Sequence, residues 1–271
     1  MGQLWLRRYT AVLACSTFIL VIAGGLVTSN DAALSIPDWP LSWGRLVPVL
    51  EGNIRYEFAH RTLALVVALL TGILAFRLRT GLAWTAFATI VAQVALGGFL
   101  VRFLDPKAGA VAHAAIAQLF FGLTVLLYLG ARPLPASLPT IAAIGLFAQT
   151  VLGAAVRHGV VGPVPHIAGA IAATGLVMWA GLSILISHMD NSRLRRPAMV
   201  LLSITFSQVF LGIGAWMSRL AYLDAPQPMP IMVFFTVAHV AVGSLALGAA
   251  LALATVAPPS RIAPQEGMAA A

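Results

Sequence analysis

The sequence predicts an all-α polytopic membrane protein in which eight transmembrane helices form two pseudo-symmetric four-helix bundles. Three observations lead to this prediction. Hydrophobic residues make up 60% of the chain and charged residues only 9%, whereas soluble proteins carry about 25% charged residues. The hydrophobic residues come in runs of about 20, the length that crosses a bilayer as a helix. A short motif also recurs at matching places along the chain, which indicates two similar halves.

The apolar runs are separated by polar or helix-breaking segments, such as the arginine-rich residues 77–81 and the proline-rich residues 132–135. Arg7 and Arg8 precede the first run, as in a signal peptide. That run is long and has no clear small-residue cleavage site, so we expect a retained first helix. The expected spans are residues 10–29, 57–77, 82–103, 109–130, 137–157, 165–187, 197–219 and 231–256.

The net charge of +8 comes mostly from arginines at the ends of the spans. This scatter favours membrane topology and anionic ligand groups as the explanation, and we expect no nucleic-acid partner. The positive-inside rule predicts a multi-pass protein of the bacterial inner (cell) membrane, with both termini in the cytoplasm. The only cysteine, Cys15, excludes an intramolecular disulfide and a thiolate metal cluster. The basic residues expected on the cytoplasmic side are Arg7, Arg8, Arg77, Arg79, Arg132, Arg193, Arg195, Arg196 and Arg261.

The recurring motif is a glutamine followed four residues later by a glycine, and then by an arginine at the end of the span. It predicts a helical hairpin used four times, with a looser version at residues 22–26 of the first span. Residues 1–131 and 132–271 are therefore expected to form the N-terminal and C-terminal halves. The small residues favour close helix packing and the glutamines hydrogen bonding across helices, and the same spacing would leave room for a flat macrocycle. The three copies are Gln93–Gly97 with Arg102, Gln149–Gly153 with Arg157, and Gln208–Gly212 with Arg219.

Four histidines lie near the start of every second span, on the extracytoplasmic side. An ionisable side chain within a membrane is costly and needs a functional reason. Imidazole is the commonest side chain for holding haem iron, so two pairs predict two bis-histidine sites. His158 and His188 do not occupy the repeated position and are expected not to be ligands. The repeated residues are His60, His113, His166 and His239.

The sharpest local motif is Glu57-x-x-His60-Arg61. Glu57 and His60 are three residues apart and share a helix face, and Glu57 falls in the first turn, where a carboxylate is stabilised. Glu57 is expected either to anchor the helix end at the water boundary or to act as an acid, a base or a cation stabiliser. Arg61 is expected to anchor to a lipid phosphate or to a ligand carboxylate.

Arginines also lie at the outer boundary of three spans. Arg102, Arg157 and Arg219 would pair with the carboxylates of a ligand, or would simply extend to the interface. The polar stretch of residues 29–56 contains prolines and tryptophans, which favours a lid or an anchor at the membrane surface.

Several of these motifs together resemble the haem A synthase family. They are Glu57-x-x-His60-Arg61, Gly24-Gly25-Leu26-Val27-Thr28 and Pro37-Asp38-Trp39-Pro40, combined with a histidine in each even span. The resemblance runs from about residue 10 to residue 256. Enzymes of that family are membrane oxidoreductases that convert the C8 methyl group of haem O to the formyl group of haem A, for cytochrome c oxidase assembly.

The resemblance implies roles for individual residues. His60 and His113 would hold the substrate haem O, His166 and His239 would ligate a haem b cofactor, and Glu57 would be catalytic. It implies two partners besides the lipid bilayer, a haem O synthase and an electron-transfer protein, and it leaves open whether the chain forms a homo-oligomer. The chain departs from many bacterial members at Ser35 and Ser42, where those members have a cysteine pair.

Two other functional classes remain open. The first is a di-haem b-type membrane electron carrier, and the second is a haem transporter or chaperone without chemistry. The carboxylate beside His60 and the family motifs argue against the electron carrier, whereas the haems extracted from the protein would distinguish the transporter from an enzyme.

Overall fold

The computed structural model describes residues 2–103, 106–130, 133–220 and 228–259. Within these residues it is built from eight α-helices and contains no β-strand, apart from an isolated bridge between Ser42 and Arg45. The helices are α1 Gln3–Ser29, α2 Ile54–Leu78, α3 Gly81–Arg102, α4 Lys107–Leu129, α5 Leu138–Arg157, α6 Pro163–Ser187, α7 Ser192–Leu220 and α8 Pro230–Val256.

All eight helices are long and apolar enough to cross a membrane, which confirms the predicted all-α polytopic membrane fold. Most bounds agree with the expected spans within three residues. Helix α1 begins earlier, at Gln3, where Trp5 stacks on Tyr9 with ring centroids 4.8 Å apart. Helix α7 begins at Ser192 and includes Pro197, whereas the sequence suggested a start at that proline. Arg132 and Arg261 lie outside the described residues.

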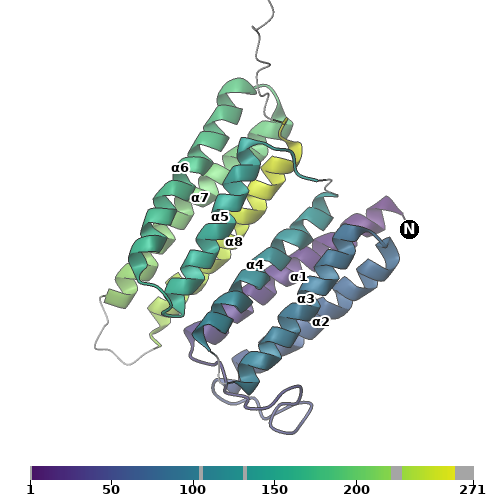
Figure 1. Cartoon of the computed structure of the whole chain (residues 1–271), viewed down its shortest axis with the longest axis vertical. Coiled ribbons are helices and arrows are strands. Elements are labelled where there is room, and N and C mark those ends of the chain that lie inside the picture. The colour runs from purple at the N-terminus through teal and green to yellow at the C-terminus, as the bar shows by residue number, and fades with distance from the viewer. Residues whose placement is uncertain (1, 104–105, 131–132, 221–227, 260–271) are drawn as a thin grey trace, which may run out of the picture.

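The helices form two groups that lie side by side, α1–α4 and α5–α8 (Figure 1). In each group the odd helix contacts the even helix that follows it, as the repeated hairpin predicted. The contacts of α1 with α4 and of α2 with α3 have counterparts between α5 and α8 and between α6 and α7. Across the groups, α1 contacts α8, α4 contacts α5, and α4 contacts α8. The set of contacts is therefore unchanged when the two groups are exchanged. The predicted boundary at residues 131 and 132 falls outside the described residues.

Each group has its own packed interior. In the first group Leu13, Leu74 and Phe120 are buried in one cluster, and in the second Val177 and Leu253 are buried in another. Helices in lipid gain little from hydrophobic burial against each other, so close packing and interhelical hydrogen bonds hold them together.

A buried hydrogen-bonded pair joins α4 to α8 between the groups. The Gln118 amide donates to the Ser244 hydroxyl at 2.9 Å, and Gln118 Oε1 lies 3.0 Å from the same hydroxyl. Because both side chains are polar and buried, the hydrogen bonds between them specify which faces of α4 and α8 meet.

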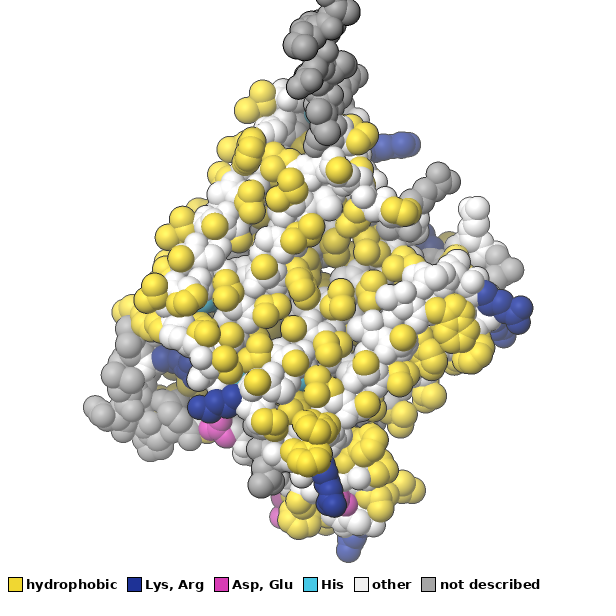
Figure 2. All heavy atoms as spheres, viewed as in Figure 1, with side chains coloured by type: hydrophobic (Ala, Val, Ile, Leu, Met, Phe, Trp, Pro, Cys, Tyr) yellow, Lys and Arg dark blue, Asp and Glu magenta, His cyan; other side chains and the backbone are white. Residues whose placement is uncertain are grey.

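The outer surface is suited to lipid along the middle of the helices. Figure 2 shows hydrophobic side chains over most of this face, with Lys and Arg side chains towards its ends. The start of α1 and the end of α8 lie at the same end of the molecule (Figure 1). The starts of the even helices, with their histidines, lie at the opposite end.

Candidate functional site

Each of the four repeated histidines lies against a glycine of the preceding odd helix. A Cβ atom on any of these glycines would approach the histidine Cε1 atom more closely than ordinary contact allows. The repeated glycine therefore forms a notch that receives the imidazole ring, which explains why the motif recurs before each histidine. The pairs are Gly24 with His60 (3.2 Å), Gly97 with His113 (3.2 Å), Gly153 with His166 (3.1 Å) and Gly212 with His239 (2.8 Å).

The repeated glutamines bond across the same hairpins, as the sequence predicted. They lie one turn before the notch glycines and point their amides at the histidine-bearing helix. Gln93 Nε2 donates to the His113 carbonyl oxygen at 2.9 Å. Gln149 Nε2 donates to the His166 carbonyl oxygen at 2.8 Å and lies 2.9 Å from the Nδ1 atom of that ring. Gln208 Nε2 lies 3.4 Å from His239 Nε2.

The spacing of His166 and His239 fits a single iron between them. Their ring centroids are 6.2 Å apart and the ring planes are nearly perpendicular, at 87°. With a metal–nitrogen bond of about 2.0 Å on each side, two imidazoles on one metal have centroids roughly 6 Å apart. The Nδ1 atoms of His60, His113 and His239 are buried, and the described residues offer them no hydrogen-bond partner.

A metal held only by protein ligands is not favoured. Among the described residues there is no group of three or more His, Cys, Asp or Glu side chains that could hold a metal ion. Paired imidazoles need a partner that supplies the remaining iron ligands, and a haem macrocycle does so. The spacing of His166 and His239 is therefore compatible with a haem between the two rings.

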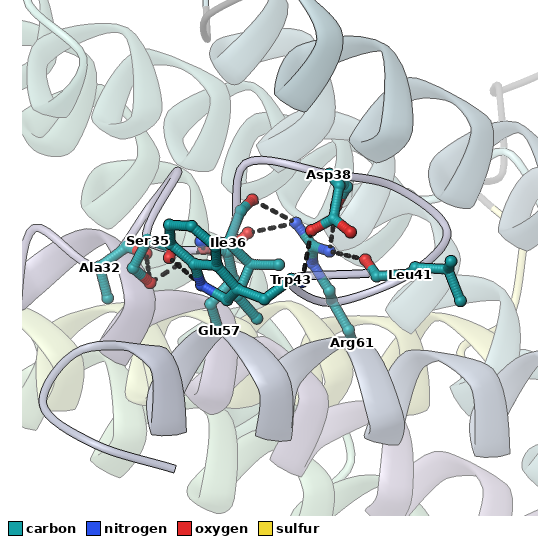
Figure 3. A network of polar contacts seen from close by, with 8 residues as sticks. All are labelled: Ala32, Ser35, Ile36, Asp38, Leu41, Trp43, Glu57 and Arg61. Atoms are coloured by element: carbon teal, nitrogen blue, oxygen red, sulfur yellow. Dashed lines mark hydrogen bonds and ion pairs between the residues drawn. The ribbon is translucent and has the colours of Figure 1, made fainter. Parts of the chain in front are cut away.

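Glu57 is buried at the start of α2 and faces the loop that precedes it, residues 30–53 (Figure 3). Its side chain accepts hydrogen bonds at Oε2 from the Ile36 backbone N–H (2.9 Å) and from the Ser35 hydroxyl (3.0 Å). Its Oε1 atom pairs with Arg61 Nη2 at 2.6 Å. The carboxylate therefore has a fixed orientation, and the anchoring role that the sequence allowed has a direct structural counterpart.

Arg61 completes the attachment of this loop. It donates through Nη1 to the Asp38 carbonyl oxygen at 2.7 Å and through Nη2 to the Ile36 carbonyl oxygen at 3.0 Å. A weaker bond reaches the Leu41 carbonyl oxygen at 3.2 Å. The sequence suggested that this guanidinium would reach outward to a lipid phosphate or a ligand, whereas these bonds direct it to the loop.

A second carboxylate, Asp38, holds the tip of the loop. It accepts from the backbone N–H groups of Trp43 (2.6 Å) and Gly44 (2.7 Å), both of which have positive φ angles. The bond from Gly44, followed by that from Trp43, holds the pKa of Asp38 below its ordinary value of 3.8. The neighbouring Trp39 ring packs on Gly98 of α3, where a Cβ atom would lie 2.8 Å from the ring.

The three boundary arginines have different environments. Arg102 is exposed and lines a cavity of about 480 Å³ between α3 and the loop residues Pro37, Asp38 and Trp39. Arg219 is exposed at the end of α7. Arg157 is partly buried and donates to Gly25 and Ser29 of α1. Arg157 therefore joins α5 of the second group to α1 of the first.

The two remaining histidines lie outside the notches. His158 follows Arg157 at the end of α5, and His188 follows α6 at the other end of the molecule. Neither position belongs to the repeated hairpin unit.

The fold and these residues define a multi-pass membrane protein with two pairs of notch-bound histidines. No protein-family model matches the chain. The chain is similar in sequence to curated proteins named haem A synthase. The relative from Symbiobacterium thermophilum is 36% identical over 147 residues, which cover 51% of this chain and 47% of the relative. The relative from Granulibacter bethesdensis is 35% identical over 134 residues, covering 44% and 36% respectively. The relative from Rhodopseudomonas palustris is 32% identical over 143 residues, covering 45% and 39%.

Each match spans less than half of the relative's own length. These similarities support membership of the haem A synthase family.

Proposed function

We propose that the protein is a haem A synthase that oxidises the C8 methyl group of haem O to the formyl group of haem A. The observation that supports this proposal is the difference between the four histidine positions. Only His60 has a carboxylate three residues before it, since the corresponding residues of the other notches are Ala110, Pro163 and Thr236. A buried carboxylate on the face of one histidine, and of one alone, favours chemistry at that site over simple binding at both.

In this proposal His60 and His113 hold the substrate haem O. The methyl group is oxidised by two successive hydroxylations, each removing two electrons and adding an oxygen atom from water. The resulting geminal diol loses water to form the aldehyde. Removal of electrons and a proton from the methyl carbon develops positive charge there, and Glu57 would stabilise that charge or deprotonate the attacking water.

The hydrogen bonds from Ile36 and Ser35 and the pair with Arg61 fix the orientation of Glu57. Each carboxylate oxygen has two lone pairs, so the orienting bonds leave acceptor capacity for a substrate water. A preoriented carboxylate needs no rearrangement at the moment when charge develops.

His166 and His239 would hold a haem b in the other half. When bound, this group supplies one-electron redox chemistry. The chain contributes the two imidazoles, the glycine notches that seat them, and the side-chain amides of Gln149 and Gln208, which lie against the two rings. An electron-transfer partner takes up the electrons, and a haem O synthase provides the substrate.

Extraction of the bound pigments tests the proposal. The chain is co-expressed with a haem O synthase, purified in detergent and its haems separated by chromatography. A haem A synthase yields haem A and hydroxylated haem besides haem b. Haem b alone would identify a b-type electron carrier, and unchanged haem O would identify a transporter or chaperone. Either of these two results refutes the proposed activity.

We further propose that both termini face the cytoplasm of a bacterial inner membrane. Cys15 is replaced by alanine, and single cysteines are placed at Glu51 in the loop of residues 30–53 or at Ser192, both exposed. A membrane-impermeant thiol reagent added to intact cells without their outer membrane should label position 51 and leave position 192 unlabelled. The reverse pattern contradicts the proposed orientation.

A further inference from the structure

A polar network joins the two groups of helices. Arg157, the last residue of α5, donates through Nη2 to the Gly25 carbonyl oxygen at 3.2 Å and to the Ser29 hydroxyl at 2.5 Å, both on α1. The Ser29 hydroxyl also lies 3.1 Å from the Thr236 hydroxyl on α8. The network therefore fastens two helices of the C-terminal group to the first helix of the N-terminal group.

Each member of this network is close in sequence to a group that positions a histidine. Gly25 directly follows the glycine that faces His60, and Arg157 lies one turn after the glycine that faces His166. Thr236 lies three residues before the other histidine of the second pair and shares its helix face. Arg157 therefore links α5, which carries the glycine facing His166, to α1, which carries the glycine facing His60.

The charge of Arg157 is also unusually placed. Its Nε atom is buried, and the described residues give it no hydrogen-bond partner. A guanidinium is a cation at neutral pH, and a charge removed from water acts more strongly on its neighbours than an exposed one. A positive charge near a haem stabilises the added electron, because net charge is one of the factors that set its potential.

We propose that Arg157 is a positioning residue shared by both sites. Its bonds to α1 hold the two histidine pairs in fixed register, and its partly buried charge raises the reduction potential of a haem held by His166 and His239. This inference rests on the proposed function in one respect, that a haem binds to that pair.

Redox titration of the purified, haem-loaded protein tests the inference without turnover. Arg157→Gln removes the charge and should shift the midpoint potential of the low-spin haem downward by roughly 59 mV, a tenfold change in the reduction equilibrium of a one-electron couple. Arg157→Lys keeps the charge but loses the planar fork. It should therefore keep most of the potential, and should lower the unfolding temperature as Ser29→Ala does. A purely structural role would lower that temperature without the charge-dependent shift in potential.

Arg55→Gln is the matched control, since Arg55 is an exposed cation near the same end of the molecule, lying over the Tyr56 ring. Solvent screens its charge, so its loss should leave the potential unchanged. Equal potentials for Arg157→Gln and Arg55→Gln would overturn the inference.

If Arg157→Gln retains no haem, Ser29→Asp replaces it as the deciding variant. It places a carboxylate against the guanidinium and cancels its charge in place, so the potential should again fall. An unchanged potential in Ser29→Asp would overturn the inference. A wild-type protein that holds haem but forms no haem A would refute the proposed function alone, since the titration remains interpretable.

Discussion

The N-terminal and C-terminal groups of helices share one scaffold and differ in what surrounds their first histidine. In α2 the histidine His60 has Glu57 on its own face and the long loop of residues 30–53 in front of it. In α6 the corresponding position is Pro163, and the preceding connection is only residues 158–162. The hairpin with its glycine notch is therefore sufficient for seating an imidazole. Glu57 and the loop of residues 30–53 are present in the N-terminal half only.

The second difference concerns how firmly the rings are held. The amides of Gln149 and Gln208 reach the rings of His166 and His239. In the N-terminal group Gln93 reaches only a backbone carbonyl, and α1 has Leu20 where the others have glutamine. Oriented rings suit a permanently bound cofactor. Among the described residues, no glutamine amide reaches the rings of His60 and His113, and His60 bonds instead to the Leu20 backbone. This arrangement suits a site that takes up a substrate and releases a product.

The largest effect that distinguishes the two halves is expected from removal of the iron ligands. His166→Ala or His239→Ala should abolish the low-spin haem b spectrum, because the iron loses an axial ligand. His60→Ala and His113→Ala should keep that spectrum and lose haem A formation. Magnetic circular dichroism of the four purified variants makes the comparison. Bis-histidine haem b retained in both His166→Ala and His239→Ala would refute the assignment of the cofactor half.

The next effect concerns the acid that only one half possesses. Glu57→Gln keeps the size of the side chain and removes its charge, so haem b content should persist while haem A per haem b falls by about 10²–10³-fold. Arg61→Gln is the matched variant, because it releases the same loop and leaves the carboxylate in place. In Arg61→Gln, haem A per haem b should fall much less than in Glu57→Gln. Equal losses in the two variants would assign Glu57 to loop anchoring, and near wild-type haem A from Glu57→Gln would refute its catalytic role.

Much of the fold could be predicted because lipid imposes a simple rule on sequence. A spanning helix needs about 20 apolar residues, so hydropathy alone located the spans. The early start of α1 at Gln3 was missed, since Arg7 and Arg8 looked like a flanking segment although helical backbone continues through them. Pro197 likewise suggested a boundary within what is a continuous helix, α7.

The site was only partly predictable. The repeat located the glutamines and glycines, and the notch role of the glycines would have followed from aligning each glycine with the histidine it precedes. The bond from the Ile36 N–H to Glu57 has no sequence signature, because every non-proline residue carries such a donor. The contact between Arg157 and Ser29 depends on how α1 and α5 lie across the interface between the groups, which local patterns do not encode.

A smaller effect should come from filling the notches. In Gly212→Ala the new Cβ atom would lie 2.8 Å from His239 Cε1, so the ring must shift and haem b retention should fall roughly tenfold. Gly97→Ala, at 3.2 Å from His113, should leave haem b unchanged and weaken haem O retention. Gly25→Ala is the control, since its nearest neighbour, Val237, is at 3.8 Å. The measurement is the content of each haem per protein in the three variants. Loss of haem b in Gly97→Ala would show that the two haem sites are not separable.

The smallest effect is a dependence on pH that only the loop of residues 30–53 should have. Backbone N–H groups of Gly44 and Trp43 depress the pKa of Asp38 below 3.8 in the folded protein. The contribution of Asp38 to the stability of the folded loop is therefore fully present above the pKa of the unfolded chain, about 3.9. It disappears as the pH falls through the lower pKa of the folded protein.

Pepsin digestion followed by mass spectrometry detects this change. Cleavage in the loop should stay slow near pH 4 and increase at lower pH. In Asp38→Asn cleavage should be faster near pH 4 and should vary less with pH, because the group that titrates is gone. The connection of residues 158–162 has no carboxylate and serves as the internal control, since its cleavage should change equally in both proteins. An acid-induced opening that persists in Asp38→Asn would assign the pH dependence to another group, and the loop's order would then rest on the Glu57–Arg61 pair instead.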